Sequence, residues 1–131
     1  MILMQFSNNI ACSKELLYKD MYIYTELVKD GKPKAVIVAP KIGYVRRLSE
    51  KVRDEIQVLT GVELKIIDDE LIKGYGPDEH NWIVLGNFAD NRAIEKLYLK
   101  FWTFVDREWP GRSSYTIQTI HDPIGTGKNV V

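Results

Sequence analysis

Residues 44–60 are the stretch of this 131-residue chain that most restricts how it can fold. Apolar residues recur there at steps of three and four, a spacing that gathers them on one face of an α-helix. These residues are Val45, Leu48, Val52, Ile56 and Leu59. Charged residues occupy most of the other positions, and Gly61 follows directly, as is common where a helix ends. We therefore predict an amphipathic helix over residues 44–60, which must bury one face against another element.

Short apolar runs on both sides of this helix predict strands. The run "KAVIVAP" has the length and composition of a buried strand, and "VELKII" and "NWIVLG" follow the helix. Upstream, "MYIYTELV" is rich in strand-forming residues and leads into Asp30-Gly31-Lys32-Pro33, which has the composition of a turn. We expect this segment to pair with "KAVIVAP" as a hairpin. An acidic loop over residues 68–79 separates the two later strands.

A second helix is predicted over residues 90–108, with Asp90 as its N-cap and Pro110-Gly111 ending it. "SSYTIQTIHD" then alternates as a strand does, and "NVV" begins a last strand. The order β-β-α-β-β-α-β-β predicts an α+β fold. In it, a mixed sheet with mostly antiparallel edges carries the two main helices packed on one face.

The length of the chain suits one domain. We expect residues 1–20 to form an N-terminal extension with a short helix after Ser13, and residues 21–131 to form a single α+β domain. The short final strand suggests that this domain is a fragment of a longer protein.

Composition and charge argue against several classes of partner. Eighteen basic residues balance eighteen acidic ones, so no net field attracts nucleic acid or an anionic membrane surface. No stretch approaches the roughly 20 apolar residues of a membrane span. Cys12 is the only cysteine, and His80 and His121 are the only histidines, so we expect no metal and no bound cofactor. The apolar start lacks a preceding Lys or Arg, so we expect a soluble chain with no signal peptide and leave its location open.

The closing residues "GTGKNVV" share a glycine and a lysine with phosphate-binding loops. Such a loop reads G-x-x-x-x-G-K followed by Ser or Thr, and it opens a helix. Here Asp122 stands five positions before Gly127, Asn129 follows Lys128, and the next residues are valines, which favour strands. We therefore interpret Gly125 to Lys128 as a turn between two strands.

Other polar motifs give weaker signals for chemistry. "LGNF" lies where a strand meets a helix, a common ligand position in open α/β sheets, but it lacks the G-x-G-x-x-G spacing. Asp68, Asp69 and Glu70 lack the spacing of a calcium loop and are interpreted as a solvated loop. His121-Asp122 and Glu79-His80 are candidate acid–base pairs with no nucleophile in a recognisable context. No catalytic residue is predicted.

Aromatic residues outside the predicted helices are the candidates for ligand contact, because flat apolar rings stack on the C–H faces of sugars. Tyr75 lies in the long acidic loop, Trp109 lies at a predicted helix end, and Trp82 lies in a predicted strand. Trp102 belongs to the apolar stripe of the second helix, where core packing is expected. We therefore predict Tyr75, Trp82 and Trp109 as the ligand-binding residues.

The succession "KAVIVAP", helix, "LTGVELKIIDDE" and "NWIVLGNF" resembles the small α+β domain that precedes the catalytic barrel in family 20 and family 67 glycoside hydrolases. The similarity covers roughly residues 22–131 and depends on short, mostly structural motifs. In related carbohydrate-active enzymes, a strand like "GKNVV" continues into a glycine-containing turn.

The resemblance implies a non-catalytic role. In those enzymes the small domain packs against a (β/α)₈ barrel that carries the acidic catalytic residues, and this chain contains no barrel. The expected function is therefore an accessory domain of a polysaccharide-processing enzyme, which braces the catalytic domain of the same, secreted or periplasmic, parent chain. Alone, it should hydrolyse no glycoside. Two alternatives stay open: a stand-alone carbohydrate-binding module, and a small nucleotide-binding protein that uses the Gly-Lys turn.

Overall fold

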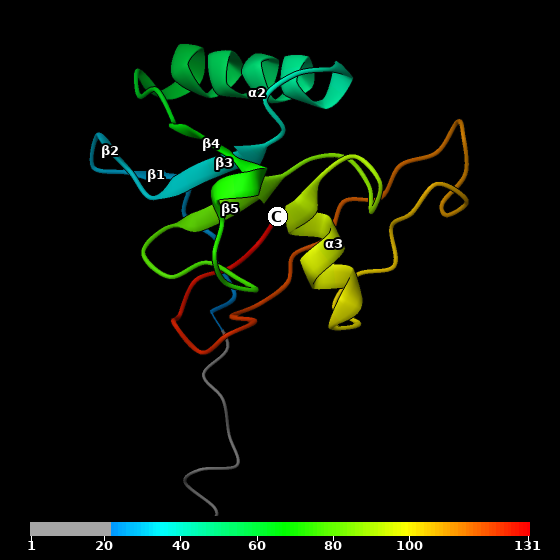
Figure 1. Ribbon diagram of the computed structural model, residues 1–131. Helices are drawn as coiled ribbons and strands as arrows, with labels where there is room; N and C mark the ends of the chain where they lie inside the picture. Colours follow the sequence, from blue (N-terminus) through cyan, green and yellow to red (C-terminus); the bar gives the residue numbers. More distant parts are fainter. Residues whose placement is uncertain (1–21) are drawn as a thin grey trace, which may run out of the picture.

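A computed structural model describes residues 22–131 of the chain. The predicted extension at residues 1–20, and the short helix after Ser13, lie outside the described residues. Figure 1 shows a small sheet with a helix on each side and a long arm that projects away from it.

Three parallel strands form the central sheet, in the order β4-β3-β5. They are β3 (Ala35–Ala39), β4 (Ile66–Asp68) and β5 (Asn81–Val84). In the register of the sheet, Ile37 of β3 lies opposite Ile66 of β4 and Ile83 of β5. Every residue of β3 is buried. A parallel strand that is covered on both faces needs a continuous apolar sequence, which explains the run "AVIVA".

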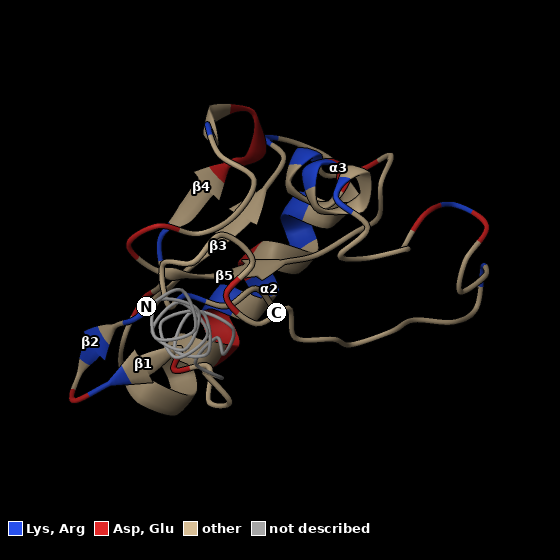
Figure 2. Ribbon diagram, turned by 90° about the horizontal axis from the view of Figure 1, so that it is seen from below, with Lys and Arg blue, Asp and Glu red and all other residues tan. Residues whose placement is uncertain are grey.

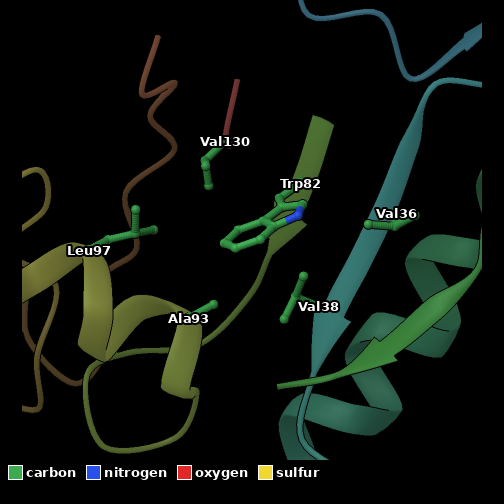
Figure 3. Close-up of a cluster of buried hydrophobic side chains, with 6 residues drawn as sticks. All are labelled: Val36, Val38, Trp82, Ala93, Leu97 and Val130. Atoms are coloured by element: carbon green, nitrogen blue, oxygen red, sulfur yellow. The ribbon is translucent and has the colours of Figure 1, made fainter. Parts of the chain in front are cut away.

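Two helices cover opposite faces of this sheet, namely α2 (Tyr44–Thr60) and α3 (Arg92–Leu99). Ile37 packs in a cluster with Val52 of α2, whereas Val38 packs in a cluster with Ala93 and Leu97 of α3 (Figure 3). Neighbouring side chains of a strand point to opposite faces. The mixed α+β fold with two main helices is confirmed. The helices lie on opposite faces rather than on the one face expected, because β3 is apolar on both faces and each face needs cover.

A separate antiparallel hairpin precedes the sheet and consists of β1 (Val28–Lys29) and β2 (Lys32–Pro33). The predicted turn is confirmed, with Asp30 and Gly31 at positive φ. The predicted pairing of "MYIYTELV" with "KAVIVAP" is reduced to one backbone hydrogen bond, from the N–H of Lys34 to the carbonyl of Leu27 at 2.9 Å, and the strand pair itself joins β1 to β2. Beyond Lys34 the chain leaves the hairpin, and β3 pairs in parallel with β4 and β5.

The two helices meet their predictions to different degrees. α2 spans the predicted residues 44–60, and the N–H of Gly61, at φ 73°, donates to the carbonyl of Gln57. α3 begins after Asn91 rather than Asp90, and the Asn91 side chain accepts a hydrogen bond from the Ala93 N–H. It ends at Leu99, well before the predicted residue 108.

Residues 103–118, here called the arm, form the projecting segment that follows α3 (Figure 1). The predicted strand over residues 113–122 is reduced to one antiparallel bridge between Ile120 and Val130. Val130 also pairs in parallel with Trp82, so the end of the chain lies beside β5. Figure 2 shows that acidic and basic residues are interspersed, including both signs at the tip of the arm.

Candidate functional site

The carboxyl ends of the three parallel strands meet at one edge of the sheet, which is where open α/β sheets usually bind ligands. A hollow of about 670 Å³, lined by both polar and apolar residues, lies at this edge, between residues 40–42, 69–70 and 88–92. We call it the carboxyl-edge crevice. The residues around it come from the loops after β3, β4 and β5, so the topology of the sheet brings them together.

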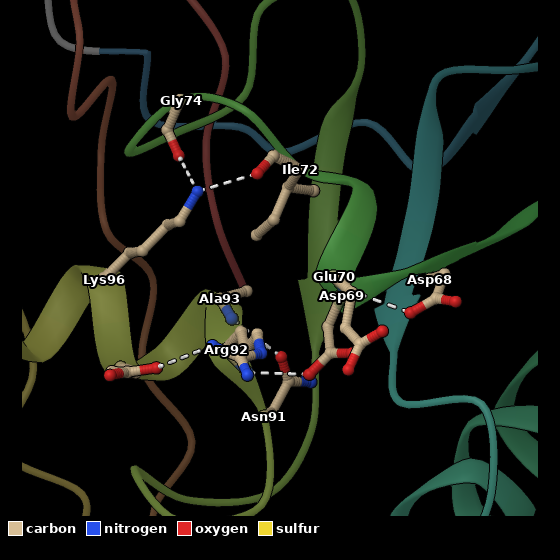
Figure 4. A network of polar contacts seen from close by, with 10 residues as sticks. Asp68, Asp69, Glu70, Ile72, Gly74, Asn91, Arg92, Ala93 and Lys96 are labelled. Atoms are coloured by element: carbon tan, nitrogen blue, oxygen red, sulfur yellow. Dashed lines mark hydrogen bonds and ion pairs between the residues drawn. The ribbon is translucent and has the colours of Figure 1, made fainter.

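Side chains of the protein itself occupy the inner part of this crevice. Asn91 Nδ2 donates to the carbonyl of Val38 at 2.9 Å and to that of Leu85 at 3.0 Å, so it bridges the ends of β3 and β5. Asp69 Oδ2 accepts a hydrogen bond from the N–H of Arg92 at 2.8 Å (Figure 4). The free N–H groups of a first helical turn are what binds an anion at such an edge. In α3, the N–H groups of Arg92 and Ala93 are both taken by protein oxygens.

The acidic residues at the crevice have separate structural tasks. Asp68 Oδ1 accepts from the N–H of Glu70 at 3.0 Å, and this bond is the main reason why the pKa of Asp68 is lowered. The Lys41 ammonium lies 3.2 Å from Asp68 Oδ2 and 3.8 Å from Glu70 Oε2. Its hydrogen bond with Asp68 raises the pKa of Lys41. Within residues 22–131, no three metal-ligating side chains converge on one point.

The loop after β4 is fastened to α3 by a second cation. Lys96 Nζ donates to the carbonyl of Ile72 at 2.7 Å and to that of Gly74 at 3.1 Å (Figure 4). The inner part of the crevice is therefore filled by internal hydrogen bonds, and its outer rim exposes charged groups together with Ile42 and Phe88.

The segment "GTGK" is held as a turn at the opposite end of the sheet. The N–H of Gly127 donates to Asp122 Oδ1 at 2.8 Å, and the N–H of Asn129 donates to Asn81 Oδ1, at the amino end of β5. Ile120 pairs antiparallel with Val130 across this turn. The predicted turn between two extended segments is confirmed. Its position is wrong for a nucleotide loop, because such loops lie at the carboxyl ends of strands.

The base of the arm is fixed to α3 by an aromatic and polar cluster. The ring of Tyr98 packs edge to face against Phe88, with centroids 4.9 Å apart, and against Phe104 at 6.5 Å. The Tyr98 hydroxyl donates to Asp106 Oδ2 at 3.1 Å. This bond raises the pKa of Tyr98.

The turn at the tip of the arm depends on the other oxygen of Asp106. Asp106 Oδ1 accepts from the N–H groups of Glu108 at 2.8 Å and Trp109 at 2.9 Å. These backbone bonds, that of Trp109 first, lower the pKa of Asp106. One carboxylate thus sets the path of the arm at both its base and its tip.

A second hollow, of about 750 Å³, lies between the arm, the start of α2 and the end of β5, and we call it the arm hollow. Its lining is mostly apolar, and it includes Val45, Leu48, Ile94, Ile117 and Val131. Gly86 also lines it, and a Cβ at this position would lie 3.2 Å from a methyl group of Val45. The glycine thus allows α2 to approach the end of β5 closely.

The structure does not bring the three predicted ligand-binding residues together. Trp82 of β5 is only 6% exposed and packs in the core between α3 and β3 (Figure 3), so its ring offers no face to a ligand. Tyr75 is 47% exposed, but the Lys100 ammonium lies 4.5 Å from its ring centroid. Trp109 is 50% exposed at the tip of the arm.

One of the candidate acid–base residues makes a contact with the start of the described chain. His121 Nδ1 lies 2.9 Å from the carbonyl of Tyr22.

Two residues at the crevice were not predicted from the sequence. Asn91 had a detectable signal, since asparagine is a preferred N-cap and stands directly before the helix. Its bridge between two strand ends depends on the topology, which no local pattern contains. Lys41 had no signal, because its carboxylate partners lie after a different strand.

The sequence matches no protein-family model, and a search among curated proteins gave no match. Within residues 22–131, no helix has both the length and the apolar character that crossing a membrane requires.

Proposed function

We propose that this chain is a non-catalytic accessory domain of a polysaccharide-processing, glycoside hydrolase-like enzyme, and that it braces the catalytic domain of the same parent chain. The observation that supports this proposal best is the apolar surface that the arm and the arm hollow expose. Monomeric domains rarely leave large contiguous apolar surfaces in water, and such surfaces commonly mark protein contacts. The carbohydrate context comes from the resemblance of the strand and helix succession.

The carboxylates of the domain also fit a non-catalytic role. Glycoside hydrolysis ordinarily needs two carboxyl groups on opposite sides of the scissile bond, about 5–10 Å apart. Asp68, Asp69 and Glu70 are neighbours on one turn, and Asp68 and Asp69 accept backbone hydrogen bonds. Asp90 and Glu95 line the crevice from the side of α3. Asp68 and Asp69 therefore cap the turn after β4 and the start of α3, and this use of their oxygens fits a structural role better than that of a reacting pair.

The proposal is tested with the purified chain and a panel of aryl glycosides. We expect no turnover above that of buffer across the panel. A Glu70→Gln variant serves as a control, because Glu70 is an exposed carboxylate at the crevice. Turnover that the wild-type chain shows and this single variant loses would refute the accessory role.

A carbohydrate-binding module is the second candidate, and the half-exposed ring of Trp109 favours it. The Asp106 carboxylate holds this residue by its backbone N–H, so the ring is presented on a fixed turn. Oligosaccharide titration followed by tryptophan fluorescence should give a saturable change that Trp109→Ala abolishes and Tyr75→Ala weakens. A flat response of the wild-type chain would rule against this candidate.

A further inference from the structure

Residues 115–119 have the sequence of a strand but no strand partner among residues 22–131. Within the described chain their backbone N–H and C=O groups make no hydrogen bond, and only the side chain of Gln118 is tied, through Nε2, to the carbonyl of Trp102 at 3.2 Å. Tyr115 is 83% and Ile117 is 80% exposed. Alternating apolar residues on a solvated, unpaired backbone are the features of an open strand edge.

This edge continues directly from the last pair of the sheet. Ile120 and Val130 exchange both backbone hydrogen bonds, at 2.8 and 3.0 Å. Val131 accepts from the N–H of Val84 at 2.8 Å and donates to the carbonyl of Trp82 at 2.9 Å. A strand antiparallel to residues 115–119 would therefore lie in line with residues 130–131 and run in the direction of β5.

The arm hollow lies alongside this open edge. Ile117 and Gln118 line it from the arm, and Val131 lines it from the sheet. The same place thus offers a row of unpaired backbone groups and an apolar hollow of about 750 Å³.

We propose that an extended strand of the neighbouring domain adds along residues 115–119 and places apolar side chains in the arm hollow. This inference rests on the proposed accessory function and names its mode of docking. A row of unpaired amides at strand spacing is satisfied by an extended backbone, whereas a docked helix or a sugar leaves most of the row unpaired.

Two arginines of the arm hollow indicate which charge the incoming strand should carry. Arg107 and Arg112 line the hollow and form no ion pair within the described residues. Asp90 and Asp106 line it as well, but Asp106 already accepts from the Tyr98 hydroxyl and two backbone N–H groups. An acidic residue at the matching end of the strand would pair with them. The partner is therefore an extended segment with apolar residues at alternate positions and a carboxylate at one end.

The test uses the full chain, labelled with ¹⁵N, and a short synthetic peptide that alternates valine and threonine and ends in glutamate. We expect saturable shifts of the amide signals and slower amide hydrogen exchange at residues 115–119. A second peptide carries N-methyl groups on its valines, so it keeps the same side chains but cannot donate backbone hydrogen bonds from those residues. This peptide should not bind. Ile117→Gln should weaken binding at least tenfold, whereas Leu59→Gln, at an equally exposed site on α2, should not.

Three results would overturn the inference. They are no saturable binding, equal binding of the N-methylated peptide, and self-association of the free chain through residues 115–119, which would make a second copy the occupant. The proposed function fails by a different measurement, since glycoside turnover by the chain would refute it whether or not the peptide adds as a strand.

Discussion

At the scale of single residues, three buried asparagine side chains connect segments that are distant in the sequence. Asn81, Asn91 and Asn129 are all buried, and each joins segments that are far apart in the sequence. An amide supplies both donors and acceptors, so one side chain can satisfy several buried backbone groups at once. The sequence alone suggested for Asn129 only that it stands where a phosphate loop needs Ser or Thr. Its partner Tyr22 lies 107 residues away, so no local pattern could reveal the contact.

Replacing Asn129 should therefore destabilise the fold strongly. Its Nδ2 donates to the Tyr22 carbonyl at 2.7 Å and to Thr25 Oγ1 at 2.9 Å, and its Oδ1 accepts from the Asp122 N–H at 3.0 Å. Asn129→Ala leaves these groups without their partner, and each buried unsatisfied group costs about 1–3 kcal/mol. We expect a loss of about 2–4 kcal/mol in the free energy of unfolding, measured by urea denaturation.

Asn87→Ala is the matched control for this variant. Asn87 Oδ1 accepts from the N–H of Ala89 at 2.8 Å in an exposed turn, where water can replace it. The control should lose less than about 1 kcal/mol. Equal losses in the two variants would show that the buried network contributes no more than a surface turn.

The elements that were predicted correctly are those whose sequence pattern lies within the element itself. The period of α2 and the glycine after it lie within the helix itself, so its bounds were found. The apolar pattern of the second helix continues past Leu99, but the chain leaves the helix at Phe101, which has φ 58°, and Trp102 turns back so that its N–H meets the Leu97 carbonyl. Trp102 therefore packs against the core from outside the helix, whereas Phe101 is exposed. The predicted strand at residues 113–122 failed because a strand needs a partner that its own sequence does not contain.

The arm should loosen in acid, because its turn depends on an ionised carboxylate. The pKa of Asp106 is lowered in the folded chain, so the contribution of its hydrogen bonds is fully present above the ordinary aspartate pKa of about 4. It is lost as the pH falls through the lowered pKa. We expect the fluorescence of Trp109, taken as the difference between the wild type and Trp109→Phe, to change over this acid range.

Asp106→Asn provides the comparison for the acid transition. An amide oxygen accepts more weakly than a carboxylate, so this variant should show the loosened Trp109 signal already at neutral pH and no further step in acid. A variant that keeps both the wild-type signal and the acid step would show that another group controls the arm.

The order of the strands determines where a ligand could bind in the whole molecule, and it could not be predicted. The sequence indicates strands, helices and turns, but the order β4-β3-β5 and the opposite faces of α2 and α3 follow from pairing between distant segments. That order places the crevice at the carboxyl edge, with Asn91 and Asp69 inside it, and the glycine turn at the amino end of β5. The two ends do not combine into one phosphate site. At the carboxyl edge the N–H groups of Arg92 and Ala93 donate to protein side chains, and the N–H of Gly127 donates to Asp122 at the other end of the sheet.

This arrangement predicts that ATP with Mg²⁺ leaves the stability of the chain unchanged. A ligand at roughly 100-fold its Kd adds about 2.7 kcal/mol to the stability of the state that binds it, which raises the Tm of a domain of this size by several degrees. We expect no such rise in a thermal-shift measurement at millimolar nucleotide, because the N–H of Gly127 already donates to Asp122. Lys128→Ala should behave like the wild type. A rise in Tm that this variant loses would instead favour the nucleotide-binding alternative, since Lys128 is the one cation of the turn that could reach a phosphate.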